Sequence, residues 1–126
     1  MGTWGAGNFD SDSALDYISS VVDDLEGKIE DLLTDEERSA LDEEGEGVLV
    51  PSVAILSALH ETVQAPTPEP ANVARWRTQY LAIYDAQIDG LEPDAEYKVE
   101  RRQVIQDTFD KLEAQAQAFW SIATEG

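Results

Sequence analysis

The acidic and amide side chains of residues 8–16 are those whose types and spacing come closest to a chemical site. Asn8, Asp10 and Asp12 alternate as the first ligands of a calcium-binding loop do. The pattern then departs from such a loop, because Ser13 stands where glycine is needed and Ser19 where glutamate is needed. Capping of a helix that begins here accounts for the same side chains. We therefore predict no metal site.

The single histidine is the other residue that could take part in catalysis. His60 is followed by Glu61, but a helical zinc motif requires a second histidine one turn away, and the chain has no other. No serine nearby has a recognisable nucleophile setting, and the absence of cysteine excludes thiol chemistry, disulfides and cysteine-ligated zinc. We expect a structural or surface histidine, and we assign no catalytic, cofactor or metal residue.

Acidity is the strongest signal in the composition. The chain has 27 acidic and 8 basic residues, a formal net charge of −19. Residues 1–47 hold fifteen acids and two bases, a net of −13, and residues 48–126 hold a net of −6. Such a field repels nucleic acid and anionic membranes and attracts basic proteins. A merely solvated acidic surface, in an acid-biased proteome, is the alternative.

The first residues form a glycine-rich arm that carries two large aromatics, Trp4 and Phe9. An aromatic so near a chain end is stable only when something covers it, so we expect the arm to pack on the rest of the chain. The alternative is a recognition loop with Trp4 at its tip. Asp10, Ser11 and Asp12 can cap the helix that follows and place carboxylates in its first turn.

The same arm carries a family resemblance. Met1-Gly2-x-Trp4-Gly5-x-Gly7-x-Phe9-Asp10-x-Asp12-x-Ala14-x-Asp16, closed by an aromatic residue, resembles the opening of a bacterial family catalogued as domain of unknown function 4259. The family usually has tryptophan where this chain has Tyr17. The close match covers seventeen residues, and the apolar stretch 53–63 is comparable to the family's central helix. The resemblance implies one helical domain of similar length and, since the family has no established activity, no mechanism.

Apolar residues recur at helical spacing along most of the chain. Pro51 suits a first helical turn, Thr34 to Glu37 has the pattern of a capping box, and the stretch 48–63 has so little polar face that we expect it to be buried. Gly27 could break the first helix. Helices are predicted at about 11–33, 34–41 (short), 48–63, 71–91 and 94–123, with an exposed acidic loop at 42–47 and a proline connector at 64–70.

These observations predict a single all-α domain, a bundle of about four main helices plus one short helix with the arm packed on it. The length of 126 residues suits one domain. The apolar run 48–59 is too short to span a membrane, and no basic region followed by an apolar one marks a signal peptide. We expect a cytoplasmic monomer or small homo-oligomer.

Three functions remain open, and the sequence favours a non-enzymatic one. The first is an interaction protein that engages a basic partner, as an inhibitor, a toxin-neutralising factor or a nucleic-acid mimic. The second is a small-ligand or metal binder, or an enzyme, with a site near the arm. The third is an acidic soluble protein without a specific basic partner. Candidate interaction residues are Trp4, Asp10, Asp12, Asp16, Asp42, Glu43, Glu44 and Glu46.

Overall fold

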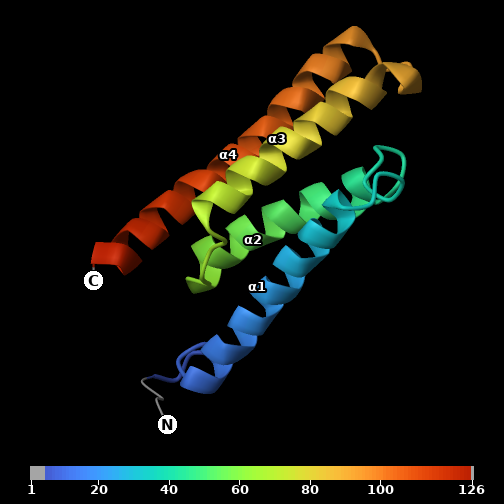
Figure 1. Ribbon diagram of the computed structural model, residues 1–126. Coiled ribbons are helices and arrows are strands. Elements are labelled where there is room, and N and C mark those ends of the chain that lie inside the picture. The colour runs from blue at the N-terminus through green and yellow to red at the C-terminus, as the bar shows by residue number, and fades with distance from the viewer. Residues whose placement is uncertain (1–4, 126) are drawn as a thin grey trace.

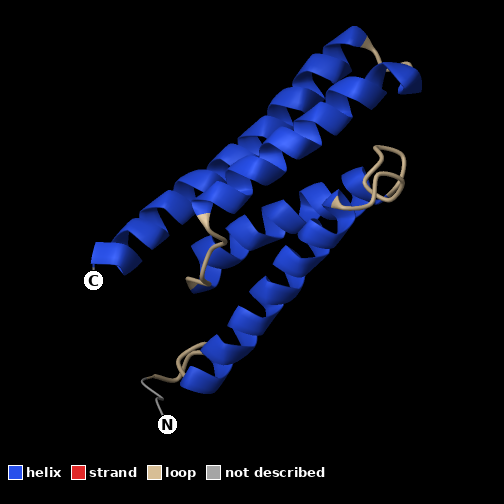
Figure 2. Ribbon diagram, in the orientation of Figure 1, coloured by secondary structure: helices blue, strands red, loops and turns tan. Residues whose placement is uncertain are grey.

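A computed structural model describes residues 5–125 of the protein, which fold into a bundle of helices (Figure 1). Within these residues the long helices run up, down, up and down, and no strand is present (Figure 2). The start of α1 and the end of α4 lie at the same end of the bundle (Figure 1). The predicted all-α fold and its four main helices are confirmed. They are α1 (Asp12–Leu33), α2 (Val50–Val63), α3 (Pro70–Gln87) and α4 (Ala95–Glu125).

The first helix begins where the sequence predicts. The hydroxyl oxygen of Ser11 accepts a hydrogen bond from the amide of Ala14 at 3.2 Å, and Asp12 places a carboxylate in the first turn. The helix is continuous through Gly27, where an added side chain would meet no other atom within 4 Å. Its buried stripe consists of Ile18, Val22, Ile29 and Leu32.

The short helix predicted after Thr34 does not form, and residues 34–43 fold into turns instead. The hydroxyl of Thr34 donates back to the carbonyl oxygen of Asp31 at 2.7 Å, so this threonine ends α1 and does not cap a new helix. Asp35 takes the capping role, because its Oδ1 accepts from the amides of Glu37 and Arg38 at 3.1 and 3.2 Å. A threonine followed three residues later by glutamate fits both arrangements.

Part of the predicted acidic loop is helical. A π-helical segment, η1 (Gly45–Leu49), leads directly into α2. Gly45 is buried, and a Cβ atom placed there would lie 2.2 Å from the carbonyl oxygen of Ser39 and 2.9 Å from that of Ala40. Since both atoms belong to the backbone, only glycine allows the turn and the helix to approach so closely.

A row of aromatic side chains lies along the buried face of α3. Trp76, Tyr80 and Tyr84 follow one another at four-residue spacing, and none is more than 1% exposed. Tyr80 packs on Phe109 of α4 with ring centroids 6.1 Å apart, and the hydroxyl of Tyr84 donates to the carbonyl oxygen of Lys98 at 2.7 Å. A 3₁₀ turn, η2 (Ile88–Leu91), continues α3 beyond these aromatics.

The central helix α2 has an unexpected orientation. It packs against α1 and α4, as expected for a central element. However, Ser52 and Ser57 lie on the buried side, whereas Ala54, Ile55 and Ala58 are exposed. The hydroxyl of Ser57 donates to the side-chain carbonyl oxygen of Gln115 at 2.8 Å, which supplies the partner that a buried hydroxyl requires. One face of α2 is therefore covered, not the whole helix.

The continuous helix of η1 and α2 is longer than the apolar run read from the sequence. Among the described residues, Gly45–Val63 is the one helix long and apolar enough to cross a membrane by length and composition, with a mean hydropathy of 1.2. This corrects the expectation that no segment approaches such a length. The core helix of a soluble protein meets the same criterion, so the length and composition alone assign no membrane location.

Replacing Gly45 should destabilise the fold. A methyl group in Gly45→Ala would overlap two backbone carbonyls, and overpacking of this kind costs about 1–3 kcal/mol. Two residues later, Gly47 has no atom within 4 Å of a built Cβ, so Gly47→Ala should be neutral or stabilise by about 0.5–1 kcal/mol. Urea unfolding measures both free energies. Equal effects of the two substitutions would contradict the close approach at Gly45.

Candidate functional site

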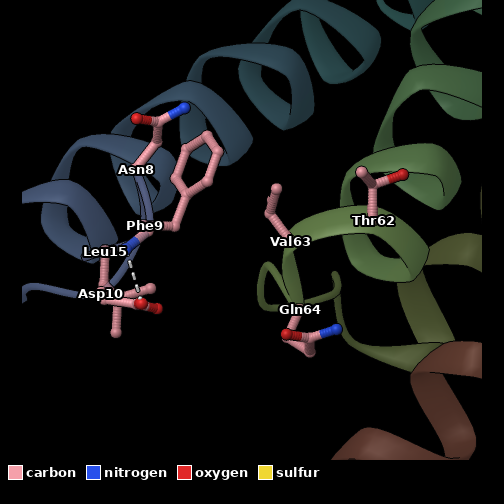
Figure 3. Close-up of a pocket in the computed structure, with 8 residues that line it drawn as sticks. Asn8, Phe9, Asp10, Leu15, Thr62, Val63 and Gln64 are labelled. Atoms are coloured by element: carbon pink, nitrogen blue, oxygen red, sulfur yellow. Dashed lines mark hydrogen bonds between the residues drawn. The ribbon is translucent and has the colours of Figure 1, made fainter. Parts of the chain in front are cut away.

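The glycine-rich arm and the end of α2 face each other across an open cleft (Figure 3). Its volume is about 400 Å³. Phe9 and Leu15 contribute apolar surface from the arm and α1, and Val63 contributes it from α2. Phe9 is 40% exposed, so it lines the cleft without being covered by it. Trp4, the other aromatic of the arm, lies outside the described residues.

Asp10 holds the arm in its bent shape. Its Oδ2 accepts a hydrogen bond from the amide of Gly7 at 2.9 Å, and its own amide donates to the carbonyl oxygen of Gly7 at 3.2 Å (Figure 3). A Cβ atom at Gly5 or Gly7 would lie 2.5 or 2.7 Å from the same carboxylate oxygen. A side chain at either position would therefore displace the Asp10 carboxylate; the glycines provide space here and not an unusual backbone conformation, since no described glycine has a positive φ.

The other acidic residues predicted near the arm do not converge with Asp10. Asp12 lies in the first turn of α1 and Asp16 is exposed one turn further on; neither lines the cleft. Among the described residues, no group of three or more histidine, aspartate or glutamate side chains is placed to hold a metal ion. The chemistry available in the cleft is thus apolar contact together with hydrogen bonding by Asn8, Thr62 and Gln64.

The wall contributed by α2 was missed from the sequence. Thr62, Val63 and Gln64 end the helix, and Gln64 adopts a left-handed conformation with φ of 54°. Pro66 gave a signal, because a helix that meets a proline must stop shortly before it. His60 helps to fix this end of α2: its Nδ1 hydrogen-bonds the carbonyl oxygen of Ala65 at 2.9 Å, and its ring meets Phe119 edge-on. A structural role for His60 follows.

Of the four acidic candidate residues in the predicted loop 42–47, two form ion pairs within the described residues and two do not. Asp42 and Glu43 are exposed and form no ion pair among the described residues. Glu44 pairs with Arg38 at 2.9 Å. Glu46 binds Arg101 of α4 through both carboxylate oxygens, at 3.2 and 2.8 Å. Glu44 and Glu46 are thus engaged within the molecule.

Most of the positive charge of the protein is neutralised internally. Within the described residues, seven of the eight basic side chains form ion pairs, Lys28 being the exception. The basic cluster of Lys98, Arg101 and Arg102 pairs with acids outside α4, namely Asp89, Glu46 and Asp85. Arg102 pairs with both oxygens of its partner, and this lowers the pKa of Asp85.

One half-exposed carboxylate of α1 connects this helix to α3. Glu30 accepts hydrogen bonds from the indole nitrogen of Trp76 and from the guanidinium of Arg75, both on α3. Partial burial acts to raise the pKa of Glu30, but the hydrogen bonds from Trp76 and Arg75 outweigh it, so the pKa is lowered. Trp76 is therefore part of the core, and its flanking arginines lie at the rim of the core.

Several other carboxylates of the first half are exposed to solvent. We use the term acidic surface for the exposed acids of α1 and the following turns that form no ion pair among the described residues. They are Asp16, Asp23, Asp24, Glu36, Glu37, Asp42 and Glu43.

The fold and these sites define a small acidic helical bundle with a bent amino-terminal arm. Residues 2–120 match the family described as Domain of unknown function (DUF4259). The chain therefore belongs to this family, which confirms the resemblance noted at the arm and extends it over nearly the whole chain. No curated protein and no solved structure matches the chain. Tyr17, the aromatic residue that follows the arm in α1, is 68% exposed.

Removal of the Glu30 carboxylate should destabilise the protein in a pH-dependent way. Glu30→Ala leaves the buried indole of Trp76 without its acceptor, at a cost of about 1–2 kcal/mol. Since the folded pKa of Glu30 is lowered, its contribution is present above the ordinary value of 4.5 and is lost as the pH falls through the folded pKa.

The neighbouring Asp31 provides the control. It pairs with Arg38 on the surface, where ion pairs contribute about 0–1 kcal/mol, so Asp31→Ala should have little effect. Urea unfolding at several pH values measures both variants. The assignment would be wrong if Glu30→Ala cost no more than Asp31→Ala at pH 7.

Proposed function

We propose that the protein is a small non-enzymatic binding protein that engages a basic protein through its acidic surface. Three kinds of basic partner fit this chemistry. The protein could inhibit its partner, neutralise a toxin, or mimic the nucleic acid that a nucleic-acid-binding protein recognises. The proposal places the chain in the cytoplasm as a monomer or small homo-oligomer.

The distribution of ion pairs is the observation that carries this proposal. Seven of the eight bases bind acids within the molecule, including Glu44, Glu46 and Asp85, so among the described residues Lys28 is the one base left near the acidic surface without an ion pair. Exposed like charges at this density repel one another, and a basic partner would relieve that repulsion. The same field accelerates the encounter with such a partner at low salt.

A matched pair of variants tests the proposal. In the first variant the four acids of the turns are neutralised as Glu36→Gln, Glu37→Gln, Asp42→Asn and Glu43→Gln, which leaves Glu44 and Glu46 in their ion pairs. The control removes four carboxylates exposed in the second half, as Glu92→Gln, Glu96→Gln, Glu100→Gln and Asp107→Asn. Both variants therefore have the same net charge.

The wild type and both variants are used as bait in a native lysate at low and high salt, with captured proteins identified by mass spectrometry. We expect the wild type and the control to retain one basic protein in stoichiometric amount at low salt, and the first variant to lose it. High salt should release it, because exposed charges are screened. Capture of nothing, or capture of the same proteins by all three baits, would refute the proposal.

The arm cleft supports a second candidate function, the binding of a small, partly apolar ligand. Its volume of about 400 Å³ lies within the range of ligand sites, and its walls combine Phe9, Leu15 and Val63 with a few polar groups. Gly7, Phe9 and Asp10 of its lining are also residues of the opening motif on which the family resemblance was read from the sequence.

A thermal-shift screen with a library of small carboxylic acids, amines and aromatic compounds tests this second candidate. A ligand present at 100 times its Kd should stabilise the protein by about 2.7 kcal/mol. Phe9→Ala should abolish the stabilisation, and Tyr17→Ala, which removes an exposed aromatic outside the cleft, should preserve it. A screen without hits, or equal stabilisation of the Phe9→Ala variant, would argue against the site.

A further inference from the structure

A second cleft lies where α1, the connector at residues 64–69 and α4 meet. Its volume is about 260 Å³. Asp23 and Glu26 of α1 and Glu69 of the connector line it, together with Thr67 and Trp120. None of the three carboxylates forms an ion pair within the described residues. The cleft thus concentrates negative charge in a partly enclosed space.

The carboxylates in this cleft repel one another electrostatically. Burial raises the pKa of Glu26, and the negative charges of Asp23, Glu30 and Glu69 raise it further. Glu30 accepts hydrogen bonds from Trp76 and Arg75, whereas Asp23, Glu26 and Glu69 form no ion pair with a basic side chain of the described residues. A cation in the cleft would remove the repulsion that these groups impose on Glu26.

Thr67 provides an independent indication of a ligand. It lines the cleft and is only 4% exposed, yet its hydroxyl has no hydrogen-bond partner in the described part of the chain. Buried hydroxyls are normally paired. The backbone of Thr67 is fixed, because its carbonyl oxygen accepts a hydrogen bond from the indole nitrogen of Trp120 at 3.1 Å. The free hydroxyl oxygen can accept a hydrogen bond from a donor that enters the cleft.

The chemistry of the cleft selects a class of cation. The carboxylates favour a positively charged ligand, the hydroxyl of Thr67 lacks a hydrogen-bond partner within the described residues, and Trp120 supplies apolar surface. A primary ammonium group on a short alkyl chain offers all three: charge, N–H donors and an apolar stem. A metal ion fits less well, because no group of three or more acidic or histidine side chains in the described residues is placed to hold one.

We propose that this cleft binds a small primary amine in its protonated form. Glu26 and Glu69 accept hydrogen bonds from the ammonium group, the hydroxyl of Thr67 accepts another, and the ring of Trp120 covers the alkyl chain. This site is separate from the arm cleft and requires none of the turn carboxylates used to test the acidic surface.

Titration with n-butylammonium chloride, followed by ¹H–¹⁵N NMR, tests the proposal. We expect saturable shifts of the Trp120 indole resonance and the Thr67 amide. The neutral analogue 1-butanol should produce no comparable shifts, because it lacks the charge. Calcium chloride at the same ionic strength should not shift these resonances in a saturable way.

Three variants assign the roles of the residues. Glu26→Gln should weaken the binding of n-butylammonium about tenfold, because a charge-assisted hydrogen bond is lost. Thr67→Val keeps the buried shape, removes the unpaired hydroxyl and should weaken binding severalfold. Glu36→Gln removes an exposed carboxylate elsewhere and should leave binding unchanged. Circular dichroism confirms that each variant is folded.

Several results would overturn the proposal. These are the absence of saturable shifts with n-butylammonium, equal affinity of the wild type and the Glu26→Gln variant, equal shifts with 1-butanol, and tighter saturable binding of calcium at the same resonances. Because the titration involves no protein partner, its failure would leave the lysate experiment on the acidic surface unaffected, and the reverse also holds.

Discussion

The hydrogen bond from Trp76 to Glu30 is the interaction on which the placement of the acidic helix depends. A tryptophan that is only 1% exposed must find an acceptor for its indole N–H, and a carboxylate of α1 supplies it. The same carboxylate binds Arg75, so one side chain joins α1 to α3 at two points. Because the apolar stripe of α1 can slide along an apolar surface, a directional bond of this kind fixes its register.

This bond also divides the carboxylates of α1 by role. Glu30 turns inward and has a lowered pKa, whereas Glu26, one turn earlier, lies among like charges and has a raised one. Two glutamates four residues apart on one helix thus have opposite electrostatic environments. The hydrogen bonds from Trp76 and Arg75 on α3 lower the pKa of Glu30, whereas burial, together with the charges of Asp23, Glu30 and Glu69, raises the pKa of Glu26.

The sequence predicts those structural features that depend on residues close together in the chain. Helical periodicity located the four long helices, and Ser11 and Asp12 located the start of α1, because capping involves residues within one turn. The predicted helix after Thr34 failed because the same residues can end a helix or begin one, and the choice depends on Asp35 and on the approach of Gly45 to Ser39. That approach is a contact with the backbone, which leaves no periodic signal.

In the candidate sites, too, local features differ from contacts between distant parts of the chain. Asp10 and its glycines form a local turn that could be recognised from the arm alone. The opposite wall of the arm cleft, the pairing of Glu46 with Arg101 and the meeting of Glu26 with Glu69 join elements far apart in the chain. Charge counting located the acidic half correctly, but it could not tell which carboxylates were already paired.

The open position of Gly27 has a practical consequence. An added side chain there would meet no atom, and the chain contains no cysteine. Gly27→Cys would therefore introduce a unique thiol on the outside of α1, one residue from Glu26. A fluorophore or spin label attached to it would report on the helix that carries Asp16, Asp23 and Asp24 of the acidic surface, without competing reactions elsewhere in the molecule.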